Sequence, residues 1–156
     1  EPDLIIADEP TTALDVTIQA QILSEMQGLL ARSRTAMLWI SHDLSVVSGF
    51  ANRIAVMYAG RIVEHGPAGA VLSAPGHPYS RGLIASLPSE NEVGRPLAQI
   101  PGSTPSLINL PAGCAFAPRC AARTEGCGER PALAAIGRDR YAACIHPNSI
   151  RTAVPA

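Results

Sequence analysis

An apolar run that ends in two adjacent carboxylates most constrains what this chain can fold into. Leu4–Ala7 is short, continuous and apolar, which is typical of a central parallel strand, although so short a run could also belong to a buried helix. Pro10 then ends the strand because proline cannot donate a ladder hydrogen bond. Asp8 and Glu9 are therefore expected at the carboxyl end of a strand, the edge where open α/β sheets bind ligands.

A second strand-like run also ends in polar residues. Ala36–Ile40 is apolar and leads into Ser41–Asp43, which contains His42. Between the two runs, residues 16–34 carry apolar side chains at helical spacing, namely Ile18, Ile22, Met26, Leu29 and Leu30. A strand, a helix and a second strand in this order form a parallel pair with a right-handed crossover. We therefore expect Glu9 and His42 to emerge at the same edge of the sheet.

These residues resemble the motifs of the nucleotide-binding subunit of ATP-binding cassette (ABC) transporters. In that family a hydrophobic run ending in Asp-Glu is the Walker B motif, Ala-Leu-Asp is the D-loop, and a His after the next strand is the switch histidine; here they are Leu4–Glu9, Ala13-Leu14-Asp15 and His42. The resemblance implies that Asp8 holds Mg²⁺ through water, that Glu9 polarises the attacking water, and that His42 contacts the γ-phosphate of ATP. It also implies that the D-loop lies at the interface with a second ATPase subunit. Thr12 stands where the broader family usually has Ser.

Composition excludes several classes of function. The chain has 156 residues and a net charge of −1, and its 12 basic residues, all Arg, are scattered without the clustered basic face of a nucleic-acid binder. It has no apolar run of about eighteen residues and no basic-then-apolar amino terminus. We therefore expect no nucleic-acid partner, no membrane span and no signal peptide.

Two motifs of the resembling family do not occur in this chain. The glycine-rich P-loop with its Lys and the Leu-Ser-Gly-Gly-type signature, which precede Walker B in that family, are absent, and the chain begins at Glu1 without an initiator Met. We therefore expect a carboxyl-terminal fragment. Alone, it should bind ATP poorly and be inactive, because the Lys and backbone amides that cradle phosphates are missing.

The residues after His42 predict the end of the core. Residues 43–51 favour a short helix. Arg53–Tyr58 and Arg61–His65 favour a hairpin, because Gly60 supplies the positive φ that a tight turn requires. The core is therefore expected to end with this hairpin.

Beyond the hairpin, proline becomes frequent. Prolines bound two predicted short helices, 67–74 and 77–88, and His77 is interpreted as the residue that starts the second. Residues 89–110 mix Pro, Gly, Ser and Asn with isolated apolar residues. They predict a linker that lies on the core, anchored by Ile100, Leu107, Ile108 and Leu110.

The four cysteines of the chain all lie in its tail, at Cys114, Cys120, Cys127 and Cys144. From Pro111 onward large apolar residues are few, so burial alone should not fold the tail and a cross-link or metal is needed. Disulfides are one alternative, but a subunit that meets ATP works in a reducing cytoplasm, which favours metal. The gaps are wider than those usual for zinc, and the residues alone leave zinc and an iron–sulfur cluster open. Four unligated buried thiols are the remaining alternative.

The tail also resembles a known family. Three runs look like the carboxyl-terminal extension of the oligopeptide and dipeptide importer ATPases, namely Ile100–Leu107, Gly113–Cys120 and Ala143–Pro147. The segment His77-Pro78-Tyr79 adds to this resemblance. Some members of that family hold a four-iron cluster there. The resemblance therefore implies a 4Fe-4S cluster on the four cysteines, with Zn²⁺ as the alternative. Because four Cys already complete such a site, we expect His146 beside it rather than among its ligands.

Together these observations predict an α/β fold, the carboxyl-terminal part of a P-loop NTPase core of ABC type with a closing β-hairpin, followed by a small Cys-rich extension. The predicted segments are an ATPase core part, a helical connector, a linker packed on the core and a Cys-rich extension, at residues 1–66, 67–88, 89–110 and 111–156. The resemblance implies a subunit that binds and hydrolyses ATP to drive oligopeptide or dipeptide uptake, peripheral at the cytoplasmic face of the cell membrane.

The same resemblance implies partners. These are a second ABC ATPase subunit, two membrane-spanning permease subunits and a solute-binding protein. Because the solute-binding protein and the permeases select the solute, this chain does not identify it. Two alternatives come from other classes of protein. One is a soluble ABC ATPase without a transport role, and the other is a metal-binding interaction module without ATPase activity.

Overall fold

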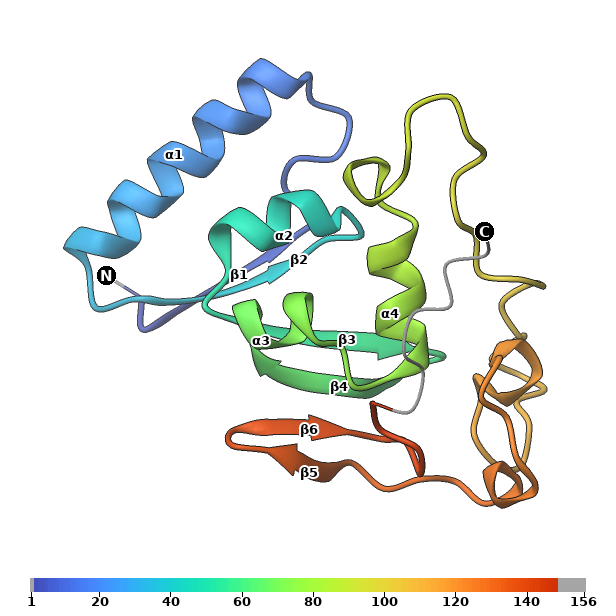
Figure 1. The fold of residues 1–156 in the computed structure, drawn as a ribbon. Helices are drawn as coiled ribbons and strands as arrows, with labels where there is room; N and C mark the ends of the chain where they lie inside the picture. The colour runs from blue at the N-terminus through green and yellow to red at the C-terminus, as the bar shows by residue number, and fades with distance from the viewer. Residues whose placement is uncertain (1, 149–156) are drawn as a thin grey trace. The chain divides into compact units, whose positions relative to one another are not determined.

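The computed structural model describes residues 2–148 and shows a mixed α/β protein of two compact units, divided between Phe50 and Ala51 (Figure 1). Each unit has its own sheet. The α/β class predicted from the sequence is thus confirmed, whereas the four predicted segments stay a prediction, and residues 149–156 of the last one lie outside the described residues. Within residues 2–148, no helix combines the length and the apolar character needed to cross a membrane.

The first unit is the predicted strand, helix and strand. β1 (Leu4–Asp8) and β2 (Ala36–Ile40) are parallel and are joined by α1 (Val16–Arg32), and α2 (Leu44–Phe50) follows β2. The register pairs Leu4 with Ala36 and Asp8 with Ile40, so both strands end at one edge. Helix α1 ends at Arg32 rather than at residue 34. The parallel pairing predicted from the sequence is confirmed.

One face of this two-stranded sheet is apolar and exposed. Its side chains are 44–62% exposed and share a face because they alternate along strands in register, namely Leu4, Ile6, Leu38 and Ile40. Parallel strands in α/β proteins are normally covered on both faces. The described residues of the first unit therefore leave open a face that a larger α/β sheet would cover.

The second unit is built on an antiparallel sheet with the strand order β3-β4-β6-β5 (Figure 1). β3 (Arg53–Tyr58) and β4 (Arg61–Pro67) form the predicted hairpin, which turns at Ala59 and Gly60 with φ of 48° and 75°. The helices α3 (Ala68–Ser73) and α4 (Pro78–Ala85) follow. Three short 3-10 helices complete the regular structure, at Pro88–Glu90, Ala117–Arg119 and Glu125–Gly128.

Two strands of this sheet come from the Cys-rich tail and were not predicted. β5 (Ala134–Gly137) and β6 (Arg140–Ala142) form a hairpin whose β6 pairs with β4, with Glu64 opposite Ala142. Both strands are short and carry little apolar alternation, so their sequence has no strand signal. The open edge of β4 supplies the backbone partners, and the tail therefore gains order from the sheet as well as from any ligand.

Aromatic rings form much of the core of the second unit. Tyr58 from β3 lies with its ring centroid 4.6 Å from that of Tyr79 on α4 and 5.3 Å from that of Phe116. Tyr58 and Phe116 are each only 4% exposed. Phe116 belongs to the Cys-rich segment, so this segment contributes directly to the core.

The linker is held differently from the prediction. Leu107 and Ile108 are 66% and 91% exposed, so the prediction that they anchor the linker is wrong. Ile100 does pack on α4, close to Gly82. The Arg119 guanidinium holds the same stretch by donating to the carbonyls of Pro101 and Ile100, at 2.8 and 3.2 Å. The linker is thus held by Ile100, as predicted, and by hydrogen bonds to its carbonyls, which were not predicted.

Candidate functional site

The two loops that leave the edge of the first unit's sheet bring Glu9 and His42 together. The Nδ1 atom of His42 lies 2.8 Å from Oε1 and 2.9 Å from Oε2 of Glu9. The backbone N–H of Glu9 donates to the carbonyl of Ile40 at 2.9 Å, which extends the β1–β2 ladder into the loop. The expectation that Glu9 and His42 emerge at one edge is confirmed, while their roles toward ATP stay predictions.

The contact changes the proton affinity of both groups. The hydrogen bond to Glu9, and then the charge of Glu9, raises the pKa of His42. Hydrogen bonds from Thr12 and then from His42 lower the pKa of Glu9. The pair therefore favours an ionised carboxylate beside a protonated imidazole. Both side chains are accessible, at 37% exposure for Glu9 and 78% for His42, so a ligand can reach them.

The loop between β1 and α1 is tightly folded. The N–H of Thr12 donates to the carbonyl of Glu9 at 3.1 Å, and the N–H of Leu14 donates to that of Thr11 at 3.3 Å. Glu9 and Ala13 have positive φ of 48° and 68°, which non-glycine residues adopt mostly where the surrounding structure holds them. This backbone geometry places the Thr12 hydroxyl 2.6 Å from Oε2 of Glu9.

Thr12 had no predicted role. The only signal available was a hydroxyl residue three positions after a candidate catalytic Glu, which is common in turns. Asp15, predicted at a subunit interface, caps α1 by accepting the N–H of Ile18 at 2.9 Å. Asp8 lies at the exposed end of β1, opposite Ile40. Their assignment to the interface and to Mg²⁺ stays a prediction, as does that of Ala13 and Leu14 to the interface.

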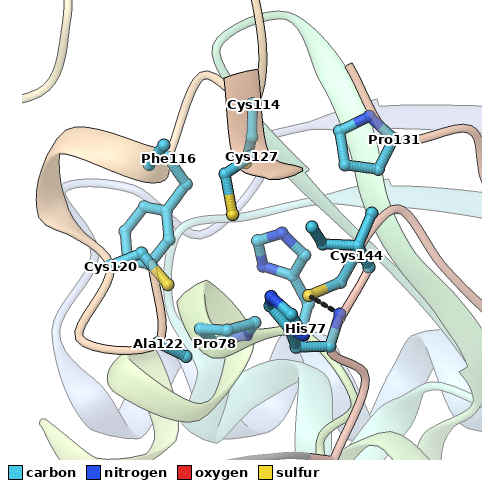
Figure 2. Close-up of a pocket in the computed structure, with 12 residues that line it drawn as sticks. His77, Pro78, Cys114, Phe116, Cys120, Ala122, Cys127, Pro131 and Cys144 are labelled. Carbon is cyan, nitrogen blue, oxygen red and sulfur yellow. Dashed lines mark hydrogen bonds between the residues drawn. The ribbon is translucent and has the colours of Figure 1, made fainter. Parts of the chain in front are cut away.

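In the second unit, the four predicted cysteines line one pocket (Figure 2). His77 and Phe116 share this pocket, which we call the cysteine pocket. Cys114, Cys120 and Cys144 are half-buried, Cys127 is buried, and all four are free thiols. Burial, and then the neighbouring cysteines, raises the pKa of Cys120 and Cys144, which indicates that the four sulfur atoms share one environment.

Within residues 2–148, no group of three or more His, Cys, Asp or Glu side chains is placed to hold a metal ion. The four thiols nevertheless line the same pocket. His146, expected beside the site, donates its backbone N–H to Cys144 Sγ at 3.3 Å and contacts Thr124 Oγ1 through Nε2 at 2.7 Å.

A fully buried carboxyl group supports the wall of the cysteine pocket. Glu64 on β4 has 0% exposure, and its two oxygens accept the N–H groups of Gly76 and His77 at 2.7 and 2.9 Å. Arg140 on β6 forms an ion pair with Glu64 at 3.4 Å. A Cβ at Gly76 would lie 2.2 Å from Cδ1 of Ile136, so a side chain there would require the Ile136 side chain to move. The sequence analysis did not identify Glu64, since a Glu in a strand usually faces solvent.

His77 is confirmed as the residue that starts α4. Its Nδ1 accepts the N–H of Tyr79 at 3.0 Å, and it is 1% exposed. Burial lowers the pKa of His77 to about 4, so the ring is neutral at pH 7. Because Nδ1 accepts a hydrogen bond, the proton of the neutral ring lies on Nε2. His77 thus joins the start of α4 to the cysteine pocket.

Comparison with known proteins shows which protein family this chain resembles. Residues 63–127 match the family described as "Oligopeptide/dipeptide transporter, C-terminal region". The chain is 51% identical over 151 residues to a Brucella melitensis protein whose name places it among peptide import ATP-binding proteins, with 92% of this chain and 45% of that protein covered.

Two further relatives carry names from the same group. The chain is 47% identical over 146 residues to the oligopeptide transport ATP-binding protein of Salmonella typhimurium, with 94% of the chain and 44% of that protein covered. It is 47% identical over 148 residues to an Escherichia coli protein named for D,D-dipeptide transport ATP binding, with 94% and 45% covered. The chain therefore spans a little under half the length of these relatives. Over more than nine tenths of its own length it is a relative of the ATP-binding subunits of oligopeptide and dipeptide ABC transporters, and it matches the carboxyl-terminal part of that family.

Proposed function

We propose that this chain supplies the carboxyl-terminal part of the ATP-binding subunit of an ABC importer for oligopeptides or dipeptides. The contact between Glu9 and His42 carries the proposal. It joins, at 2.8 Å, the two residues that the family motifs assign to the attacking water and to the γ-phosphate. The relatives named for peptide transport support the substrate class.

The residues around this contact have complementary roles in the proposal. Glu9 accepts the proton of the attacking water, since its lowered pKa keeps it ionised at neutral pH. The protonated His42 ring donates a hydrogen bond toward the γ-phosphate through Nε2 while Nδ1 stays on Glu9. Asp8, at the exposed end of β1, would hold Mg²⁺, which neutralises charge on the phosphates.

Other parts of the proposed assembly would contact two surfaces of the first unit, the apolar face of its sheet and the D-loop. Further strands and helices of a P-loop NTPase core would cover the exposed apolar face of β1 and β2 and supply the phosphate-cradling loop. A second ATPase subunit would pack against the D-loop residues Ala13, Leu14 and Asp15. The remaining partners are two permease subunits and a solute-binding protein, with the ATPase peripheral at the cytoplasmic face of the membrane.

Reconstitution of the complete subunit with its permeases and solute-binding protein in vesicles tests the proposal. We expect Mg²⁺-dependent ATP hydrolysis that rises when peptide-loaded binding protein is added. The present chain alone should not hydrolyse ATP, because it lacks a P-loop. A rate of ATP hydrolysis that does not change when permeases or peptide are added would instead favour a soluble ABC ATPase. Absence of hydrolysis by the complete subunit would favour a binding module without activity.

We propose in addition that the four cysteines hold a 4Fe-4S cluster. Support comes from the cysteine pocket, which all four cysteines line and in which neighbouring thiols contribute to the raised pKa of Cys120. Four Cys thiolates are the usual ligand set of a four-iron cluster. Because Phe116 and β6 tie the tail to the core of the second unit, the proposed role of the cluster is structural.

Anaerobic purification tests the cluster. We expect brown protein with about four irons per chain, and loss of colour and iron in Cys120→Ser. Ser106→Ala, a change in the exposed linker, is the control and should retain the iron. Colourless protein with one zinc per chain would replace the cluster by a zinc site. Protein that carries neither metal would leave four free thiols as the explanation.

A further inference from the structure

We infer that Thr12 is a positioning residue for the proposed base Glu9, and that its hydroxyl orients the Glu9 carboxylate for attack by water. The inference rests on the proposed ATPase function and adds a residue to it. It is carried by one short hydrogen bond, from Thr12 Oγ1 to Glu9 Oε2 at 2.6 Å, in a loop whose backbone forces the two side chains together.

The carboxylate has two partners from different loops. His42, from the loop between β2 and α2, lies 2.8 and 2.9 Å from the two oxygens through Nδ1. Thr12 donates to Oε2 from within the loop of Glu9 itself. A carboxylate held by His42 alone could still turn about its side-chain torsions, because one atom, Nδ1, contacts both oxygens. The second donor distinguishes the two oxygens, because Thr12 donates to Oε2 and not to Oε1.

The backbone of the loop sets the position of Thr12 beside Glu9. Its N–H donates to the carbonyl of Glu9 at 3.1 Å, so the turn itself sets the position of the hydroxyl. The positive φ of Glu9 and Ala13 shows that unfavourable backbone conformations are maintained on both sides of Thr12. Such conformations persist where the surrounding structure over-determines them, and they concentrate at functional sites.

The same loop connects Thr12 to the residues of the proposed subunit interface. Ala13, Leu14 and Asp15 follow Thr12 directly, and Asp15 anchors the end of the loop by capping α1 through Ile18 at 2.9 Å. A partner that moves these residues would move the Thr12 hydroxyl, and with it the Glu9 carboxylate. Thr12 thus gives a short physical route from the D-loop to the base.

Thr12→Val and Thr12→Ser in the complete subunit test the inference. Valine keeps the shape and removes the donor, and we expect kcat to fall about tenfold with KM for ATP unchanged. Serine keeps the hydroxyl and should restore kcat. The control Thr17→Val makes the same change at an exposed position of α1 and should match the unaltered subunit.

The outcomes separate this inference from the proposed function. If the unaltered subunit hydrolyses ATP and Thr12→Val does so within twofold of it, the positioning role is wrong while the ATPase stands. Equal losses in the valine and serine variants would also overturn it, because the hydroxyl would then not be the active feature. Loss of hydrolysis in the unaltered subunit would overturn the proposed function instead.

Discussion

Replacement of Glu9 by Gln is expected to lower ATP turnover by the complete subunit by about a hundredfold or more while ATP binding is retained. An amide has nearly the shape of the carboxylate but cannot accept a proton from water. Steady-state hydrolysis and equilibrium nucleotide binding, measured on the same preparation, separate these two effects. The nucleotide-bound pair of subunits should accumulate, because its decay requires hydrolysis.

Glu25→Gln is the matched control for this substitution. Glu25 lies on the exposed side of α1, so the same chemical change there should leave turnover as it was. Turnover close to that of the unaltered subunit in Glu9→Gln would remove Glu9 from the role of base. The 2.8 Å contact between Glu9 and His42 would then only hold the two loops together.

Replacement of Glu64 by Ala is expected to lower the free energy of unfolding of the second unit by about 3–5 kcal/mol. The substitution leaves two buried N–H groups, those of Gly76 and His77, without an acceptor and removes the ion-pair partner of Arg140. A buried donor or charge that loses its partner costs more than the original pair contributed. Urea unfolding, followed by fluorescence and circular dichroism, measures the change.

Two further variants make this prediction specific. Glu64→Gln keeps one oxygen acceptor in nearly the same volume and should therefore lose less than the alanine variant. Glu129→Ala, the same truncation at an exposed position, should change stability by less than about 0.5 kcal/mol. A loss below about 1 kcal/mol in Glu64→Ala would show that the turn before α4 is held by other contacts.

Much of the first unit could be predicted from the sequence because its signals are local. The apolar runs of β1 and β2 and the helical spacing between them define the elements, and the parallel order then brings Glu9 and His42 to one edge. The contact itself could not be measured from the sequence. The role of Thr12 was missed because it depends on a turn with positive φ at Glu9, and the residue types in this loop do not predict that turn.

The second unit shows why tertiary structure overrides local patterns. Glu64 is charged, yet it is fully buried, because the bulge in the β3–β4 pairing turns it inward toward the N–H groups before α4. Leu107 and Ile108 are apolar, yet they are exposed, while Arg119 holds the linker at the carbonyls of Ile100 and Pro101. In both cases the residue type alone does not predict burial.

The sequence by itself determined the α/β class, the order of elements through α4 and the motifs that connect this chain to peptide-transport ATPases. Only the tertiary structure decided that β5 and β6 join the core sheet, that the four cysteines share a pocket with His77, and that Thr12 reaches Glu9. The reason is physical. Periodicity records which faces are apolar along one element, whereas these contacts join residues through loop closure and sheet pairing, which depend on the whole chain.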